Sequence, residues 1–332
     1  NAEKAGNIDI ALEAYQHIID QGKSNKFFTS AIYSYTRTLE AKMMFDKDLS
    51  VTNINRIISR YETIIEEFPK STTAADAYLE IARLQKDQLH NYSSAEETLH
   101  ELTKEIPNAP QSGNAMIELS DIYISRGNIT DAKSYLDIAK VRYTRLNRNI
   151  SDIIGFRQAM IEYYIGNLDS AESLFLVLAE SRDNDIANDV LEKNSILADK
   201  YKEEEKVKVF TSAEYDLIKL DTNSAISKFD LIIDNLRNFD TEIWQRSHLI
   251  LSDIYKNRNN LIKANFYLED FIKNLPDGVH TDKALYKLAN NKSQAGDNAR
   301  AIELYSKILM DFPNSIYLDR ARLKIRELRG ES

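Results

Sequence analysis

The chain has 332 residues, of which 43% are hydrophobic and 29% charged, and it carries a net charge of −9 and no cysteine. This composition is that of a folded protein rather than a disordered tail, and it excludes disulfides, thiolate metal sites and a cysteine nucleophile. The acidic balance argues against a nucleic-acid partner, because such binding depends on neutralising phosphate charge, and it permits basic or neutral protein partners. No apolar run reaches the ~18 residues of a membrane-spanning helix, so we expect no transmembrane segment.

The first predicted helix contains Ala11 and follows a turn at Gly6-Asn7. The same turn and spacing recur later in the chain at the start of the second helix of a helix pair, so Ala11 belongs to a second helix. Too few residues precede it for a complete first helix. We therefore expect polypeptide before Asn1 in the natural protein, and any signal sequence or lipid anchor would lie there. A helix over about 25–45 follows, marked by aromatic and aliphatic side chains at helical spacing.

The stretch from Ile117 to Ala139 contains the unit that the chain repeats. Apolar side chains at spacings of three and four define one helical face on each side of Gly127-Asn128. Glycine suits the end of a helix, where the residue past the last turn often adopts a positive φ. The stretch therefore predicts two antiparallel helices. Copies of the turn are followed, five residues after the glycine, by the anchor residues Ala11, Ala132, Ala171 and Ala301.

Weaker copies lack the glycine but keep the later positions, with anchors at Ile57, Ala95, Ala225 and Ala264. A large side chain stands four residues after each anchor, and it is expected to fill the groove between neighbouring pairs. The chain has five prolines, and four of them share one place, twelve residues after an anchor: Pro69, Pro107, Pro276 and Pro313. Proline there ends the second helix, because it lacks an N–H and disfavours helical dihedrals in the residue before it.

This pattern resembles the tetratricopeptide repeat family. The matching residues are Leu119-Ser120, Tyr123, Gly127, Ala132, Leu136 and Ala139, then Leu251-Ser252, Tyr255, Ala264, Leu268 and Pro276, then Leu288-Ala289, Gly296, Ala301, Tyr305 and Pro313. The resemblance covers nearly the whole chain and implies an all-α fold, a right-handed superhelical solenoid of antiparallel helix pairs with about 16–17 helices. It also implies protein partners, bound on a concave surface that the first helices of the pairs line.

The segment 186–220 departs from the repeat, because it has neither glycine nor proline and carries two apolar faces that are out of phase. It predicts either one long helix whose buried face rotates or an extra helix with a break near Glu203. We expect a long or broken helix that joins two halves. The domains are then N-terminal repeats over 1–185, the first of them truncated, C-terminal repeats over 221–314, and a capping helix over 315–332.

No catalytic or metal-binding motif stands out. The five histidines show no ligand spacing, and we expect them at the surface or in a groove. There is no phosphate-binding glycine loop and no recognisable Ser–His–Asp set. Trp244, the only tryptophan, is expected in the core. We therefore predict a protein that is not an enzyme and that needs no cofactor and no metal.

Helical spacing around the anchors selects candidate partner-binding residues on the first helices. They are Met160, Tyr163, Tyr164, Arg246, Asp253, Lys256, Asn257, Tyr286, Asn290 and Gln294. Tyr163-Tyr164 is the preferred pair, because exposed aromatic side chains in a groove supply contact area at low entropic cost. The alternative is that Tyr163 packs between repeats. The full basic and amide set that grips a terminal carboxylate in some members of the family is not recognisable here.

The predicted function is a non-catalytic protein–protein interaction scaffold that organises a multiprotein complex. In the segments 67–71 and 311–315 a serine closely follows the proline, and these segments resemble bacterial envelope repeat proteins of the BamD and Tol–Pal-associated type. That resemblance implies a lipoprotein or another periplasmic or outer-membrane-associated protein. Two alternatives stay open: a cytoplasmic adaptor or chaperone-like peptide-binding module, and the repeat region of a larger enzyme.

Overall fold

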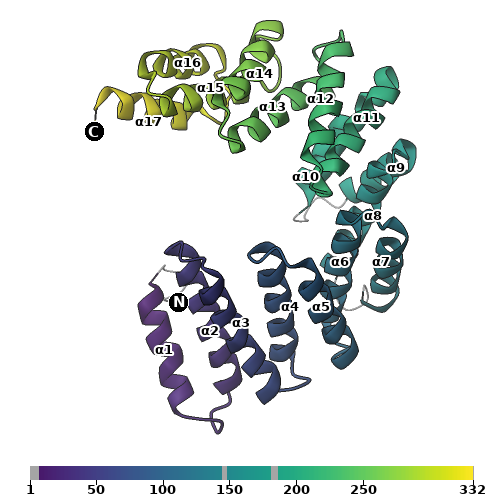
Figure 1. Cartoon of the computed structure of the whole chain (residues 1–332), viewed down its shortest axis with the longest axis vertical. Coiled ribbons are helices and arrows are strands. Elements are labelled where there is room, and N and C mark those ends of the chain that lie inside the picture. The colour runs from purple at the N-terminus through teal and green to yellow at the C-terminus, as the bar shows by residue number, and fades with distance from the viewer. Residues whose placement is uncertain (1–6, 144–147, 181–185, 332) are drawn as a thin grey trace. The chain divides into compact units, whose positions relative to one another are not determined.

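The computed structural model describes residues 7–143, 148–180 and 186–331, and these residues form 17 α-helices and no strand (Figure 1). The prediction of an all-α fold with about 16–17 helices is therefore confirmed. Among the described residues, no helix combines the length and the apolar character needed to cross a bilayer.

The chain divides into two compact units, Asn1–Ile161 and Glu162–Ser332. The first unit contains α1 (Ile8–Asp20), α2 (Phe28–Phe45), α3 (Val51–Glu67), α4 (Thr72–Asp87), α5 (Tyr92–Glu105), α6 (Pro110–Ser125), α7 (Ile129–Tyr143) and most of α8 (Arg148–Tyr164). The second contains α9 (Leu168–Ala179), α10 (Ala187–Ala198), α11 (Lys200–Ile218), α12 (Thr222–Asn235), α13 (Glu242–Asn257), α14 (Leu261–Asn274), α15 (Thr281–Gln294), α16 (Asn298–Asp311) and α17 (Leu318–Arg329).

Within each unit the helices pack as sequential pairs, with the predicted anchors at the contacts. Consecutive helices such as α4 and α5, or α15 and α16, lie against each other, and alternate first helices such as α4 and α6 also touch. Every anchor is buried, and so is the large residue four positions later, except Tyr15 near the start of the chain. The burial of each of these large side chains contributes about 1.5–3 kcal/mol to stability. The core is thus a seam between neighbouring helices rather than one central cluster.

The turns before α5, α7, α12, α14 and α16 have the same geometry whether or not they contain glycine. Gly127 and Gly296 have φ of 80° and 83°, and in the copies without glycine the equivalent residues His90, Leu220 and Asn259 also have positive φ, between 51° and 62°. A side chain in this left-handed region costs about 1 kcal/mol. The fold therefore imposes this turn even where the residue disfavours it.

The four periodic prolines end second helices in the predicted way. The residue before each proline closes the helix with φ between −125° and −138°, outside the helical region; these residues are Phe68, Ile106, Leu275 and Phe312. In the first Pro-x-Ser segment, Ser71 then caps α4 by accepting a hydrogen bond from the N–H of Ala74 at 3.0 Å. In the last, the Ser315 hydroxyl donates to Asp282 and accepts from the N–H of Tyr317. Both serines therefore have structural tasks at helix starts.

The segment 186–220 lies within the second unit and forms α10 and α11, with a break at the expected place. Glu203 has non-helical dihedrals of φ −140° and ψ 44°. Because α11 pairs with α12, α10 is an extra helix outside the pair pattern. At the C-terminus, α17 packs on α16 as the expected single closing helix, but it begins at Leu318 because Ser315–Tyr317 form the turn before it.

Candidate partner-binding surfaces

Two of the predicted groove residues turn out to be buried. Met160 is 7% exposed, and Tyr163 is fully buried with its hydroxyl donating to Glu214 Oε2 at 2.6 Å. Burial, followed by the charge of Glu214, raises the pKa of Tyr163 well above its usual value. The neighbouring Tyr164 is half-buried and stacks on Tyr215 with ring centroids 5.1 Å apart. Tyr163 therefore packs between helices, which was the alternative interpretation, and it offers no exposed ring to a partner.

Arg246 is also engaged within the second unit. Its guanidinium pairs with Glu242 on the same helix and with Glu192 of α10 at 3.0 Å, and its side chain is 18% exposed. Glu242 in turn lies 2.9 Å from His280 Nε2. Arg246 thus links α10 to α13 in this structure instead of facing open solvent.

Four predicted residues come together in one pocket. Asp253 and Lys256 from α13 and Tyr286 and Asn290 from α15 line a cavity of about 290 Å³. The remaining wall is formed by Ser252, Lys283, Lys287, Asn291 and Tyr317. We call this the α13–α15 pocket. The last two candidates, Asn257 and Gln294, are exposed at the ends of these helices and do not line it.

The α13–α15 pocket has an excess of positive charge, because three lysines face one carboxylate. Lys287 pairs with Asp253 at 2.5 Å. Among the residues that the structure describes, neither Lys256 nor Lys283 has an ion-pair partner. Two lysines that line one pocket without an ion-pair partner among the described residues favour an anionic ligand.

Aromatic and amide side chains complete the chemistry of this pocket. Tyr286 and Tyr317 stack with ring centroids 4.7 Å apart. Asn290 accepts a hydrogen bond from the Tyr305 hydroxyl at 2.8 Å, which leaves its amide N–H₂ as a donor. Asn291 donates to Asn265, and its own Oδ1 is buried without a hydrogen-bond partner among the described residues. The pocket therefore offers cations and hydrogen-bond donors beside a flat aromatic wall.

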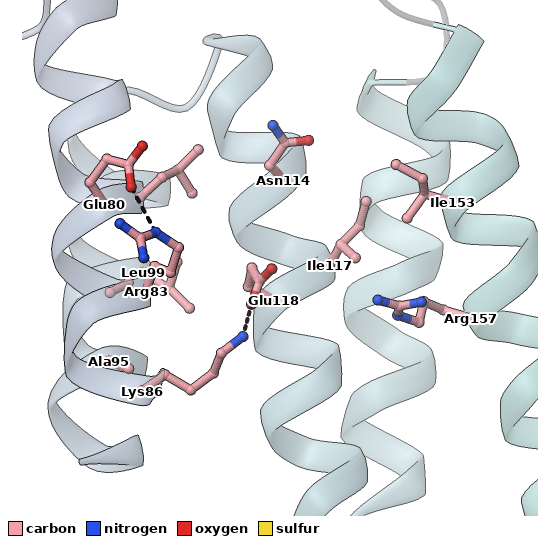
Figure 2. Close-up of a pocket in the computed structure, with 12 residues that line it drawn as sticks. Glu80, Arg83, Lys86, Ala95, Leu99, Asn114, Ile117, Glu118, Ile153 and Arg157 are labelled. Atoms are coloured by element: carbon pink, nitrogen blue, oxygen red, sulfur yellow. Dashed lines mark hydrogen bonds and ion pairs between the residues drawn. The ribbon is translucent and has the colours of Figure 1, made fainter. Parts of the chain in front are cut away.

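A second pocket, of about 430 Å³, lies in the first unit between α4, α5, α6 and α8 (Figure 2). Its floor is aliphatic, formed by Leu79, Leu99, Ile117 and Ile153. Figure 2 shows the charged side chains of this pocket, with the pairs Arg83–Glu80 and Lys86–Glu118 as dashed lines. Arg83 also pairs with Glu40, and Arg157 pairs with Asp121, so every cation that lines the pocket is paired. The repeat pattern in the sequence did not indicate this pocket. It is lined mainly by first helices, but its charges are already neutralised within the unit.

The expectation for the histidines is wrong for His248, whereas that for Trp244 is confirmed. Both side chains are buried, with exposures of 0% and 1%. His248 Nδ1 lies 3.0 Å from Trp244 O, and Nε2 lies 3.0 Å from Asp270 Oδ2. The imidazole is therefore a core group, and its burial lowers the pKa of His248. Within the described residues, no three His, Asp or Glu side chains gather in a way that would hold a metal ion.

Comparison with known proteins identifies one repeat directly. Residues 283–315, which contain most of α15 and all of α16, match the family model of the tetratricopeptide repeat. The helix-pair architecture defines a helical-repeat protein, and the segment 283–315 is similar to a tetratricopeptide repeat. That repeat supplies Lys283, Tyr286, Lys287 and Asn290 of the α13–α15 pocket.

Several solved structures are similar to this chain, all at low identity. A tetratricopeptide repeat protein from Parabacteroides merdae is 13% identical, with a TM-score of 0.44 over 87% of this chain and 94% of that one. Yeast Tom70 is 16% identical, with a TM-score of 0.39 over 93% and 64% of the two chains. PilF of Pseudomonas aeruginosa is 15% identical, with a TM-score of 0.29 over 78% and 97%. No curated protein sequence matches the chain. The resemblance to bacterial envelope proteins of the BamD type stays a prediction.

Proposed function

We propose that this chain is a non-catalytic protein-interaction scaffold that binds an acidic segment of a partner protein in the α13–α15 pocket. The observation that carries the proposal is the pair Lys256 and Lys283, which lie in one pocket without a carboxylate partner among the described residues. The chain as a whole has a net charge of −9, whereas this pocket has an excess of positive charge. An anionic segment is therefore attracted to the pocket.

The size and walls of the pocket support a peptide rather than a free ion. A cavity of about 290 Å³ accommodates one or two side chains of a partner. A carboxylate there would receive charge-assisted hydrogen bonds from Lys256, Lys283 and the amide of Asn290. The stacked rings of Tyr286 and Tyr317 supply rigid contact area, as aromatic residues do at binding hot spots. These are the properties of a recognition site, and they support a binding role for the chain.

The direct test is a binding titration with short labelled peptides rich in Asp and Glu, and with Asn and Gln counterparts of the same length. We expect the acidic peptides to bind with an affinity that falls as salt rises, because the contact is between charges. The double variant Lys256→Ala/Lys283→Ala should bind about tenfold or more weakly. The matched control Lys273→Ala/Lys307→Ala removes the same charge outside the pocket and should bind normally. Equal loss in both variants, or no preference for acidic peptides, refutes the proposal.

Two finer features belong to the same proposal. The chain organises a multiprotein complex, and it acts at the bacterial cell envelope, in the periplasm or at the outer membrane. The envelope location is supported by the Pro-x-Ser segments 67–71 and 311–315. Fractionation of the natural host tests it: recovery of the protein with periplasmic or outer-membrane material is expected. Recovery only with the cytoplasm would refute the envelope location and favour the cytoplasmic adaptor instead.

A further inference from the structure

The extra helix α10 covers the place where the sequence predicted exposed tyrosines. Its Lys193 donates to both oxygens of Glu214, at 2.9 and 2.8 Å, and its ammonium lies 4.9 Å from the centre of the Tyr163 ring. The Lys193 and Glu214 side chains are only 12% and 16% exposed. Helix α10, which does not belong to the repeat pattern, therefore helps to bury Tyr163 and Glu214.

Two further polar contacts attach α10 to α13. Glu192 pairs with Arg246 at 3.0 Å. After the end of α10, Asp199 Oδ2 accepts a hydrogen bond from the N–H of Ile243, in the first turn of α13, at 2.9 Å. Anions are stabilised at such helix starts, because the first N–H groups have no partner within the helix. The contacts of α10 with this surface are therefore charged and directional.

The apolar packing of α10 is modest by comparison. Its buried residues are Val190, Ile196 and Leu197, and Leu191 is 62% exposed. The Oδ1 of Asn194 is buried without a hydrogen-bond partner among the described residues, which disfavours the packed position. Whereas α13 buries eight of its residues, α10 buries three, so α10 opens more readily than the α13 helix on which it lies.

We propose that Tyr163, Glu214, Arg246 and the first turn of α13 form a helix-binding site, which the chain's own α10 occupies in this structure and which a partner helix can take over. The charges of the site specify the partner. Without α10, Glu214 lacks an ammonium partner, while Arg246 keeps only Glu242. The matching helix carries a carboxylate and an ammonium at consecutive positions, as Glu192-Lys193 does, and an acidic residue that reaches the start of α13.

This site is separate from the α13–α15 pocket. It would be a second binding surface of the scaffold, one that the chain's own α10 covers. The two lie on different parts of α13: Arg246 and Ile243 are in its first half, while Asp253 and Lys256 are near its end. Failure of one proposal therefore leaves the other in place.

The test uses a labelled peptide with the sequence of residues 186–199 as the probe, added to the intact chain and to the variant Glu192→Ala/Lys193→Ala. We expect the peptide to bind the variant about tenfold or more tightly than the intact chain, because the variant's own α10 no longer competes. A peptide in which the Glu and the Lys are exchanged should bind weakly to both. The control variant Leu191→Ala changes an exposed residue of α10 and should behave as the intact chain does.

Binding of the peptide to neither protein, or equally to both, overturns the proposal, provided that Trp244 fluorescence shows the variant to be folded. If the variant is unfolded, hydrogen exchange on the intact chain decides instead. The amides of α10 should exchange faster than those of α12 and α13, since α10 opens on its own. Exchange of α10 as slow as that of α13 would contradict a displaceable helix.

Discussion

Replacing Glu242 by glutamine should remove a pH-dependent part of the stability of the second unit. Burial by itself raises the pKa of Glu242, but the hydrogen bonds and charges of His280 and Arg246 outweigh it and lower the pKa to about 2, from an ordinary value of 4.5. Since a tenfold change in proton affinity corresponds to about 1.4 kcal/mol, the ionised carboxylate contributes about 3 kcal/mol at neutral pH. The side chain is only 14% exposed, so solvent screens this contribution weakly.

The sign follows from the lowered pKa. The contribution is complete above the unfolded value of about 4.5 and is lost as the pH falls towards 2. Trp244, two residues further along α13 and buried in the core, reports unfolding by its fluorescence in urea. We expect Glu242→Gln to lower the free energy of unfolding by about 3 kcal/mol at pH 7 and by less than half of that at about pH 3. The exposed Glu303→Gln should change it by less than about 0.5 kcal/mol. If Glu242→Gln lowers the free energy of unfolding by the same amount at pH 7 and at pH 3, the reasoning from the lowered pKa is refuted.

Four further substitutions test packing and helix capping in the first unit, each followed by circular dichroism in urea. Leu99→Ala removes a side chain that is 1% exposed between α4 and α5, and should lower the free energy of unfolding by about 3 kcal/mol; a change below about 1 kcal/mol would mean that the site collapses around the cavity. Gly113→Ala places a Cβ 2.9 Å from Cβ and Cγ of Tyr143, so about 2 kcal/mol should be lost, and an unchanged midpoint would contradict this close approach. Ser71→Ala removes the cap of α4 and should cost about 1 kcal/mol, whereas Ser71→Gly should cost only a few tenths; equal losses would rule out the capping role.

The fold followed from the sequence because its signals are local and repeated. An alanine anchor, a large residue one turn later and a proline after the helix recur at fixed spacing, and each acts within a single helix pair. The signal at Glu203 was also local, since two apolar faces out of phase cannot belong to one straight helix. The turns at His90, Leu220 and Asn259 could not be predicted from residue type, because tertiary packing overrides their preference for negative φ.

The candidate site was predicted in part. Helical spacing on α13 and α15 selected Asp253, Lys256, Tyr286 and Asn290, which the structure brings together. Lys283 and Lys287 lie on the same face of α15 at spacings of three and four from those residues, so the same rule would have found them.

Three other outcomes depend on contacts between residues distant in the sequence. Tyr163 is covered by Lys193 of an inserted helix, and Arg246 is paired with Glu192 of that same helix. His248 Nε2 lies 3.0 Å from Asp270 Oδ2 of the next helix, α14. Periodicity within a single helix carries no information about such partners, because it describes only which face a residue is on.

The measurement that tests the central claim most directly is site-specific photo-crosslinking in the natural host. A photoreactive residue replaces Tyr286 in the α13–α15 pocket, and a second version carries it at Glu303, which is exposed on α16 outside the pocket. We expect the first position to crosslink a defined protein through an acidic segment, and the adduct should disappear when Lys256 and Lys283 are replaced by alanine. Adducts that form only at position 303, or that persist in the lysine variant, would contradict binding in this pocket.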